Sequence, residues 1–152
     1  MDSLRKTISI LAITASATLG LTIVNHASPA HAALSNCYSG AACAWNHDDY
    51  GSVYFASIGR AYDYQQENQT DGSVANDKAN SVANMGNTCD VVFWQRYGYT
   101  GNAIRFNNPA DGGTTRDPHL GNGGGYSHSG GSTINRADWR NIISSHSWTD
   151  CS

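Results

Sequence analysis

The residues of this 152-residue chain best suited to covalent chemistry are its four cysteines, Cys37, Cys43, Cys89 and Cys151. Their number is even and no two are spaced as CxxC, a pattern that in an exported chain favours two disulfides over a zinc site. Three connectivities are open, and we favour Cys37–Cys43 together with Cys89–Cys151. Because paired thiols cannot act as nucleophiles, the cysteines predict a covalently tied scaffold and no cysteine catalysis.

The other residue types that could do acid–base or metal chemistry are scattered. Asp48 and Asp49 are adjacent, so on a strand they would point to opposite faces, and we interpret them as hairpin-turn residues. The sequence contains no HExxH, no GxSxG and no Walker loop, which argues against the common hydrolase and nucleotide-binding sites. We interpret four widely spaced histidines as solvated loop residues: His47, His119, His128 and His146. The sequence therefore predicts a binding protein and not an enzyme.

The first 32 residues have the features of a secretory signal peptide. Arg5 and Lys6 precede an apolar run from Thr7 to Val24, and Ala30-His31-Ala32 is a small-x-small cleavage pattern. An uncleaved membrane anchor is the alternative, which the many Ser and Thr of the run and the cleavage pattern disfavour. We expect a signal peptide over 1–32, a mature domain over 33–152, secretion to the extracellular space, and no membrane association after cleavage.

Composition narrows the possible partners. The mature part carries seven Lys and Arg against eleven Asp and Glu, a net charge of about −4 without a basic cluster, which makes nucleic acid an improbable partner. Its length of about 120 residues suits one domain with a real core. We expect a monomer.

The elements that must position these residues are short β-strands. Runs rich in aromatic and β-branched residues recur between Gly- and Asp-containing turns, with no sustained helical period. From Asn107 to Gly131 the chain is rich in Gly and Asn, and we interpret it as a long flexible excursion. The expected strands are Ala41–Trp45, Ser52–Ala56, Asp90–Gln95, Ala103–Phe106 and Ile142–Trp148.

An internal repeat divides the mature chain into two units. Trp45-x4-Tyr50 followed by Gly51 opens the first unit, and Trp94-x4-Tyr99-x-Gly101 opens the second. Each unit ends in a polar turn that leads into a Ser-headed strand, Asn76–Val82 in the first and Arg140–Ser145 in the second.

These motifs resemble the βγ-crystallin Greek-key signature, aromatic-x4-aromatic-x-Gly, with its companion calcium-loop pattern of two Asn/Asp, two variable residues and Ser/Thr-Ser. Together with the signal peptide and the close pair Cys37 and Cys43, the chain resembles the secreted bacterial peptidase inhibitor family I36 from about Asn36 to Cys151. The resemblance implies an all-β, βγ-crystallin-like sandwich of two Greek-key motifs, tied by disulfides, that inhibits secreted metalloproteases.

The resemblance also implies where a metal would bind. Each site of the family pattern draws oxygens from both polar turns, which here would come from Asn76, Asp77, the carbonyl of Lys78, and Ser144. Only Asp77 brings negative charge, whereas Lys78 and Arg140 bring positive charge. We therefore expect no firmly held cofactor and at most one weakly bound calcium ion.

The leading hypothesis is a secreted inhibitor whose partner is a protease and whose surface loop enters the protease cleft. Two loops are candidates, the Gly-rich excursion around Asp117, His119 and Tyr126, and the segment Tyr62–Asp71. One alternative is a non-inhibitory βγ-crystallin-like module that binds calcium, associates with the cell wall or acts as a killer-toxin-like effector. Another is a carbohydrate-binding protein that uses exposed tyrosines, namely Tyr62, Tyr64, Tyr97 and Tyr126.

Overall fold

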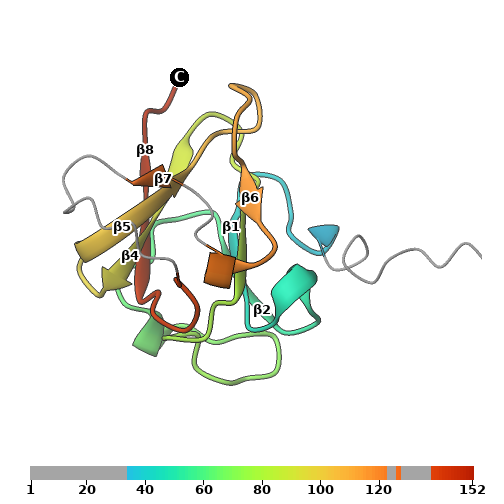
Figure 1. Ribbon diagram of the computed structural model, residues 1–152, viewed down its shortest axis with the longest axis vertical. Helices are drawn as coiled ribbons and strands as arrows, with labels where there is room; N and C mark the ends of the chain where they lie inside the picture. Colours follow the sequence, from blue (N-terminus) through green and yellow to red (C-terminus); the bar gives the residue numbers. More distant parts are fainter. Residues whose placement is uncertain (1–33, 123–125, 128–137) are drawn as a thin grey trace, which may run out of the picture.

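The chain folds into two four-stranded antiparallel sheets that face each other across one core. The computed structural model describes residues 34–122, 126–127 and 138–152, and Figure 1 shows the sheets as two layers, with β8 beside β4. The strand order is β2-β1-β3-β6 in the first sheet and β7-β5-β4-β8 in the second. The strands are β1 (Ala42–Trp45), β2 (Tyr54–Ser57), β3 (Ser81–Asn84), β4 (Asp90–Arg96), β5 (Thr100–Phe106), β6 (Arg116–Asp117), β7 (Tyr126–Ser127) and β8 (Ser145–Thr149).

Three single 3-10 turns interrupt the strands: η1 (Asp48–Tyr50), η2 (Tyr64–Gln66) and η3 (Leu120–Asn122). Within the described ranges, no helix has the length and apolar character needed to cross a membrane. Residues 1–33 are not among them, so the signal peptide stays a prediction from sequence.

Each sheet is completed by a segment of the other unit. β6 belongs to the second unit but pairs with β3 of the first, where Val82 lies opposite Asp117. In the same way Ala61, from the first unit, forms an antiparallel bridge with His146 on β8. This reciprocal exchange of the third strand is the Greek-key arrangement, and it makes the segment around Ala61 an edge of the second sheet.

Equivalent residues of the two units make the same contacts. Trp45 pairs with Ser81 and Trp94 pairs with Ser145, so the two hairpins hold equivalent places. The Ser81 hydroxyl donates to the His47 carbonyl at 2.8 Å, and the Ser145 hydroxyl donates to the Arg96 carbonyl at 2.7 Å. The duplicated all-β sandwich expected from the repeat is therefore confirmed.

The core lies between the sheets because strand residues alternate between the two faces. Its larger members come from both units, and they are Phe55, Tyr64, Val82, Val91, Phe93, Ile104, Phe106, Leu120, Trp139 and Ile143. Burial of each large apolar side chain in such a core is worth about 1.5–3 kcal/mol. A second cluster lies on the other face of β1, around Trp45 and Tyr50, and includes the Cys37–Cys43 disulfide.

The second disulfide joins the chain on either side of the β4–β8 pair. Asp90, the first residue of β4, lies opposite Thr149, the last residue of β8, which brings Cys89 and Cys151 together with Cα atoms 4.0 Å apart. Both disulfides join the pairs favoured from the sequence, and no described cysteine is free.

One fold prediction was wrong in part. Within the expected Gly-rich excursion from Asn107 to Gly131, Arg116–Asp117 form β6, Leu120–Asn122 form η3 and Tyr126–Ser127 form β7, and Leu120 is fully buried. The reason is the strand exchange, since two residues of β6 and one apolar side chain suffice to fasten this stretch to the first unit. Residues 123–125 and 128–131 lie outside the described residues.

Candidate functional site

The two polar turns lie side by side and bind each other through their backbones. Asp77 and Asn141 adopt positive φ values of 54° and 56°, a conformation in which Asn and Asp are the favoured residues after Gly. The Asp77 N–H donates to the Ile143 carbonyl at 3.0 Å, and the Asn141 N–H donates to the Ala79 carbonyl at 2.8 Å. The turns are thus a symmetric clasp between the units.

Three of the four residues predicted to hold calcium meet at this clasp. The Ser144 hydroxyl lies 3.0 Å from Asp77 Oδ1 and 3.1 Å from the Gln95 carbonyl oxygen, and Asn76 Nδ2 donates to Asp77 Oδ2 at 2.7 Å. Both oxygens of the Asp77 carboxylate therefore already have partners within the protein. The fourth residue, Lys78, is exposed.

The donor set fits a firmly bound calcium ion poorly. Calcium takes six to eight oxygens, several of them from carboxylates, whereas Asp77 supplies the one carboxylate that the described residues place at this clasp. The described residues contain no group of three or more His, Cys, Asp or Glu placed to hold a metal ion. Arg140 is directed elsewhere, because its guanidinium pairs with Asp138 at 2.9 Å. A calcium ion here would have to displace the bonds that Asp77 makes with Asn76 and Ser144.

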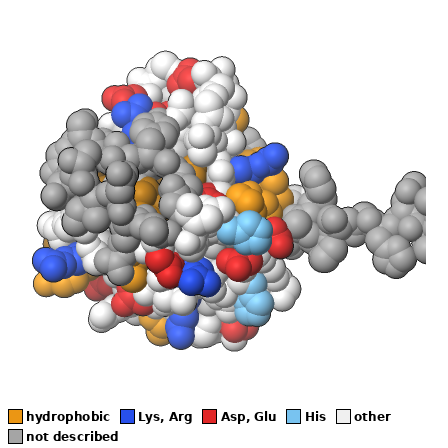
Figure 2. Space-filling model, viewed as in Figure 1, with side chains coloured by type: hydrophobic (Ala, Val, Ile, Leu, Met, Phe, Trp, Pro, Cys, Tyr) orange, Lys and Arg blue, Asp and Glu red, His pale blue; other side chains and the backbone are white. Residues whose placement is uncertain are grey.

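A histidine lies between the two adjacent carboxylates of η1. His119 Nε2 lies 3.2 Å from Asp49 Oδ1, and His119 Nδ1 lies 3.5 Å from Asp48 Oδ2. Figure 2 shows histidine and acidic side chains next to one another on this face. The Asp49 N–H also donates to the Pro118 carbonyl at 2.9 Å, so these contacts fasten the η1 turn to the loop that follows β6.

The interpretation of His146 as a solvated loop residue was wrong. His146 is fully buried on β8, among the rings of Phe55, Phe93 and Trp148 at centroid distances of 6.0–6.1 Å. Burial lowers the pKa of His146 to about 4, because an imidazolium cannot be solvated there. His146 is therefore neutral at physiological pH. His47 is exposed as expected, and His128 lies outside the described residues.

The hydrogen bonds of His146 define its tautomer. The ring Nε2 lies 2.8 Å from the Gly59 carbonyl oxygen, which can only accept, so Nε2 carries the proton. The ring Nδ1 then accepts from the Tyr64 hydroxyl at 2.9 Å. Burial raises the pKa of Tyr64 well above its usual value, so the phenol keeps its proton. His146 thereby joins the segment at Gly59 to the core of the second unit.

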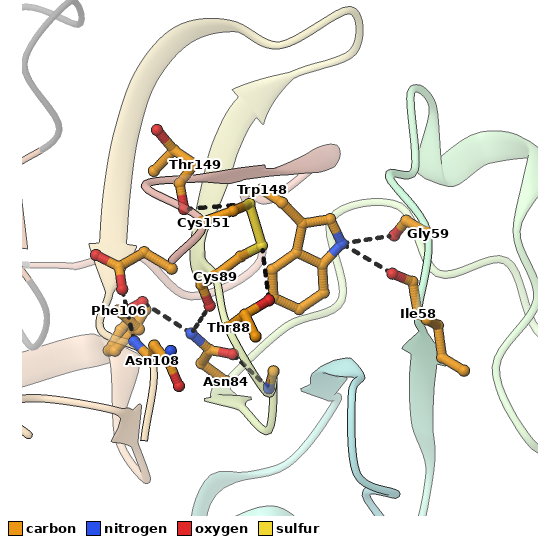
Figure 3. The surroundings of a disulfide bond; sticks show 12 residues. Ile58, Gly59, Asn84, Thr88, Cys89, Phe106, Asn108, Trp148, Thr149 and Cys151 are labelled. Atoms are coloured by element: carbon orange, nitrogen blue, oxygen red, sulfur yellow. Dashed lines mark hydrogen bonds between the residues drawn. A yellow bond between two sulfur atoms is a disulfide. The ribbon is translucent and has the colours of Figure 1, made fainter. Parts of the chain in front are cut away.

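A cavity opens beside the Cys89–Cys151 disulfide, at the junction of the two units. Its volume is about 360 Å³, within the range of small-ligand pockets. The indole Nε1–H of Trp148 donates to the Ile58 carbonyl at 2.9 Å, with the Gly59 carbonyl at 3.3 Å (Figure 3). No sequence pattern predicts this cavity, because its lining comes from distant positions: Gly40, Ile58, Gly86, Asn87, Thr88, Cys89, Trp148 and Cys151.

Each of the two loops named as candidates for an inhibitory contact contains a buried, hydrogen-bonded residue. In the segment Tyr62–Asp71, Tyr64 is buried and its N–H donates to the Ser144 carbonyl at 2.9 Å. In the Gly-rich stretch, Asp117 is buried and its carboxylate accepts the His119 N–H at 2.8 Å. Asp117 therefore cannot meet a partner, and the side chain of Tyr126 is outside the described residues.

Two of the tyrosines considered for carbohydrate binding are exposed and adjacent. Tyr62 is 58% exposed and Tyr97 62% exposed, and their ring centroids lie 6.4 Å apart. The ring of Tyr99 lies 5.5 Å from that of Tyr62. The Gly98 N–H donates to the Tyr62 carbonyl at 2.8 Å, so the end of the β4–β5 hairpin holds Tyr62 in place.

The fold is that of a βγ-crystallin domain. A solved structure described as "Evolution of the eye lens beta-gamma-crystallin domain fold" superposes on 75% of this chain and 89% of its own, with a TM-score of 0.52 and 17% identity. Residues 30–106, about half of the chain, match the peptidase inhibitor family I36. The chain belongs to that family. No curated protein matches its sequence.

Proposed function

We propose that the mature domain is a secreted inhibitor of metallopeptidases. The observation that carries the proposal is the match of residues 30–106 to an inhibitor family, on a scaffold that two disulfides and a strand exchange hold rigid. Rigidity favours inhibition, because a loop that is already ordered loses little entropy when it docks. The predicted signal peptide and the two disulfides support an oxidising, extracellular location. In this proposal the domain acts by binding a peptidase and catalyses no reaction itself.

The test is a panel of secreted peptidases incubated with the purified 33–152 protein, with and without calcium. The proposal expects a thermolysin-type metallopeptidase to lose activity as the protein approaches a stoichiometric amount, while serine and cysteine peptidases keep theirs. Unchanged cleavage across the whole panel would remove the inhibitor assignment.

A calcium-binding module is the second candidate, and the observation that favours it is the meeting of Asn76, Asp77 and Ser144. The bonds that already occupy Asp77 predict weak binding at most. Calorimetry with calcium decides between the two candidates: a clear heat and a higher melting temperature would favour the module, and a flat titration would leave the inhibitor.

A further inference from the structure

We propose that the segment Ile58–Tyr62 is the part of this chain that enters the peptidase cleft, with Arg60 at its centre. The inference rests on the proposed inhibitory function and names the surface that performs it. It moves the contact from the two loops expected from the sequence to the segment around the Ala61–His146 bridge, which shares only Tyr62 with the expected loop Tyr62–Asp71. Three observations carry it: the free backbone of Arg60, the exposed side chains beside it, and the bonds that hold the segment from behind.

The backbone of Arg60 is unpaired at the edge of the second sheet. Ala61 exchanges both of its hydrogen bonds with His146, at 3.1 and 3.0 Å. Along a strand the N–H and C=O groups of successive residues point to opposite sides, so those of Arg60 are directed away from β8. They make no hydrogen bond with any described residue. An edge of this kind can pair with another chain, which is how an extended peptide adds to a sheet.

Three side chains of the segment are exposed, on either side of the buried Ala61. Ile58 is 65% exposed and Tyr62 58% exposed, whereas Ala61 is only 2% exposed. Arg60 lies between them, is exposed, and forms no ion pair with any described residue. Tyrosine and arginine are enriched among the residues that contribute most to protein interfaces. Arg60 adds a local positive charge to an acidic domain, which suits a cleft with acidic character.

The segment is held at both ends by side chains and backbone of the second unit. At its start, Trp148 donates to the Ile58 carbonyl at 2.9 Å and His146 donates to the Gly59 carbonyl at 2.8 Å, and Figure 3 shows the Trp148 indole directed at this backbone. At its end, the Gly98 N–H donates to the Tyr62 carbonyl. A segment fixed in this way meets a cleft at little entropic cost.

The duplicated fold supplies a matched control. Asp117 on β6 lies opposite Val82 as Ala61 lies opposite His146, so Arg116 is the equivalent of Arg60 on the other edge. Arg116 is also exposed. An Arg116→Glu variant changes charge by the same amount as Arg60→Glu, at an equivalent edge position that the proposal leaves outside the contact.

The experiment measures the inhibition constant of the 33–152 protein against the metallopeptidase that the wild type inhibits best. We expect the double variant Arg60→Glu, Tyr62→Ala to raise that constant by about 30-fold or more, as loss of central interface residues does. Arg116→Glu should change it by less than about threefold, the usual range for a peripheral charge. Melting temperatures of all three proteins establish that each variant is folded, and hydrogen exchange of the wild-type complex should show new protection over residues 58–62.

The possible results separate a failure of the proposed inhibitory function from a failure of the assignment of Ile58–Tyr62. If the wild type inhibits no metallopeptidase, the proposed function fails and this inference fails with it. If the wild type inhibits but the double variant inhibits equally well, or Arg116→Glu weakens inhibition as much as the double variant does, only this inference is overturned. New protection confined to the Asn107–Thr115 or Thr70–Ser73 loop, or binding to a polysaccharide that the double variant abolishes without loss of inhibition, would also overturn it.

Discussion

Acid should destabilise this domain through the buried His146. The pKa of His146 falls from 6.5 to about 4 on folding, so between these values the unfolded chain binds a proton that the folded chain refuses. The contribution of neutral His146 to the free energy of unfolding is therefore fully present above pH 6.5 and is lost progressively as the pH falls from 6.5 toward 4. At about 1.4 kcal/mol for each tenfold change in a protonation equilibrium, the loss amounts to about 3 kcal/mol.

The structural reason is that a protonated His146 would carry a charge among apolar rings and would lose its hydrogen bond with Tyr64. An imidazolium donates from both nitrogens, so Nδ1 could no longer accept from Tyr64. Protonation also weakens the join to Gly59 indirectly, since the charged ring would have to leave the apolar rings around it. The segment Ile58–Tyr62 should open with it, and inhibition should weaken over the same pH range.

The assay is urea unfolding from pH 7 to pH 4 for the wild type and for His146→Gln. The wild type should lose stability steeply in this window, while His146→Gln starts lower at pH 7 and changes much less. A His146 pKa near 6.5 in an NMR titration, or equal slopes for the two proteins, would refute the reasoning.

Three further changes have expected outcomes that follow from the fold. Replacing Cys89 and Cys151 with Ser should lower the free energy of unfolding by about 4 kcal/mol, because the bond closes a loop of 62 residues; unchanged urea unfolding would contradict this. Ser145→Ala should cost about 1–3 kcal/mol, since the Arg96 carbonyl loses its donor, and an unaltered melting temperature would oppose it. Gly98→Ala should cost about 1–2 kcal/mol, because Gly98 has a φ of 71°, and a more stable variant would contradict that assignment.

Much of the fold could be predicted from local sequence because its signals are repeated. The spacing of Trp94, Tyr99 and Gly101 indicates a hairpin, and the matching residues of the first unit indicate that the hairpin is duplicated. Once a duplicated sandwich is assumed, the position of Cys89 before one strand and Cys151 after its partner makes their pairing reasonable. These inferences need only residues close in sequence, or an equivalence between halves.

The missed features depend on contacts between the halves. His146 lies within the expected strand Ile142–Trp148, but the side chains that bury it come from both units, and its partner Tyr64 is 82 positions earlier in the sequence. The segment Ile58–Tyr62 joins the second sheet through a single bridge at Ala61, too short for any strand period. β6 has only two residues, so its Gly-rich surroundings dominate the sequence signal.

The calcium prediction grouped the right residues but missed the hydrogen bonds between them. The sequence placed Asn76, Asp77 and Ser144 in one site, and the structure brings them together. Their spacing could not reveal that Asn76 and Ser144 already bond to the Asp77 carboxylate. Whether calcium binds depends on the balance between those bonds and the ion, which a pattern of residue types does not contain.

The most direct test of the account is a titration of a thermolysin-type metallopeptidase with the purified 33–152 protein at an enzyme concentration well above the inhibition constant. The account predicts a straight fall in activity that reaches zero near one equivalent of the protein. Activity that stays level through several equivalents would contradict it.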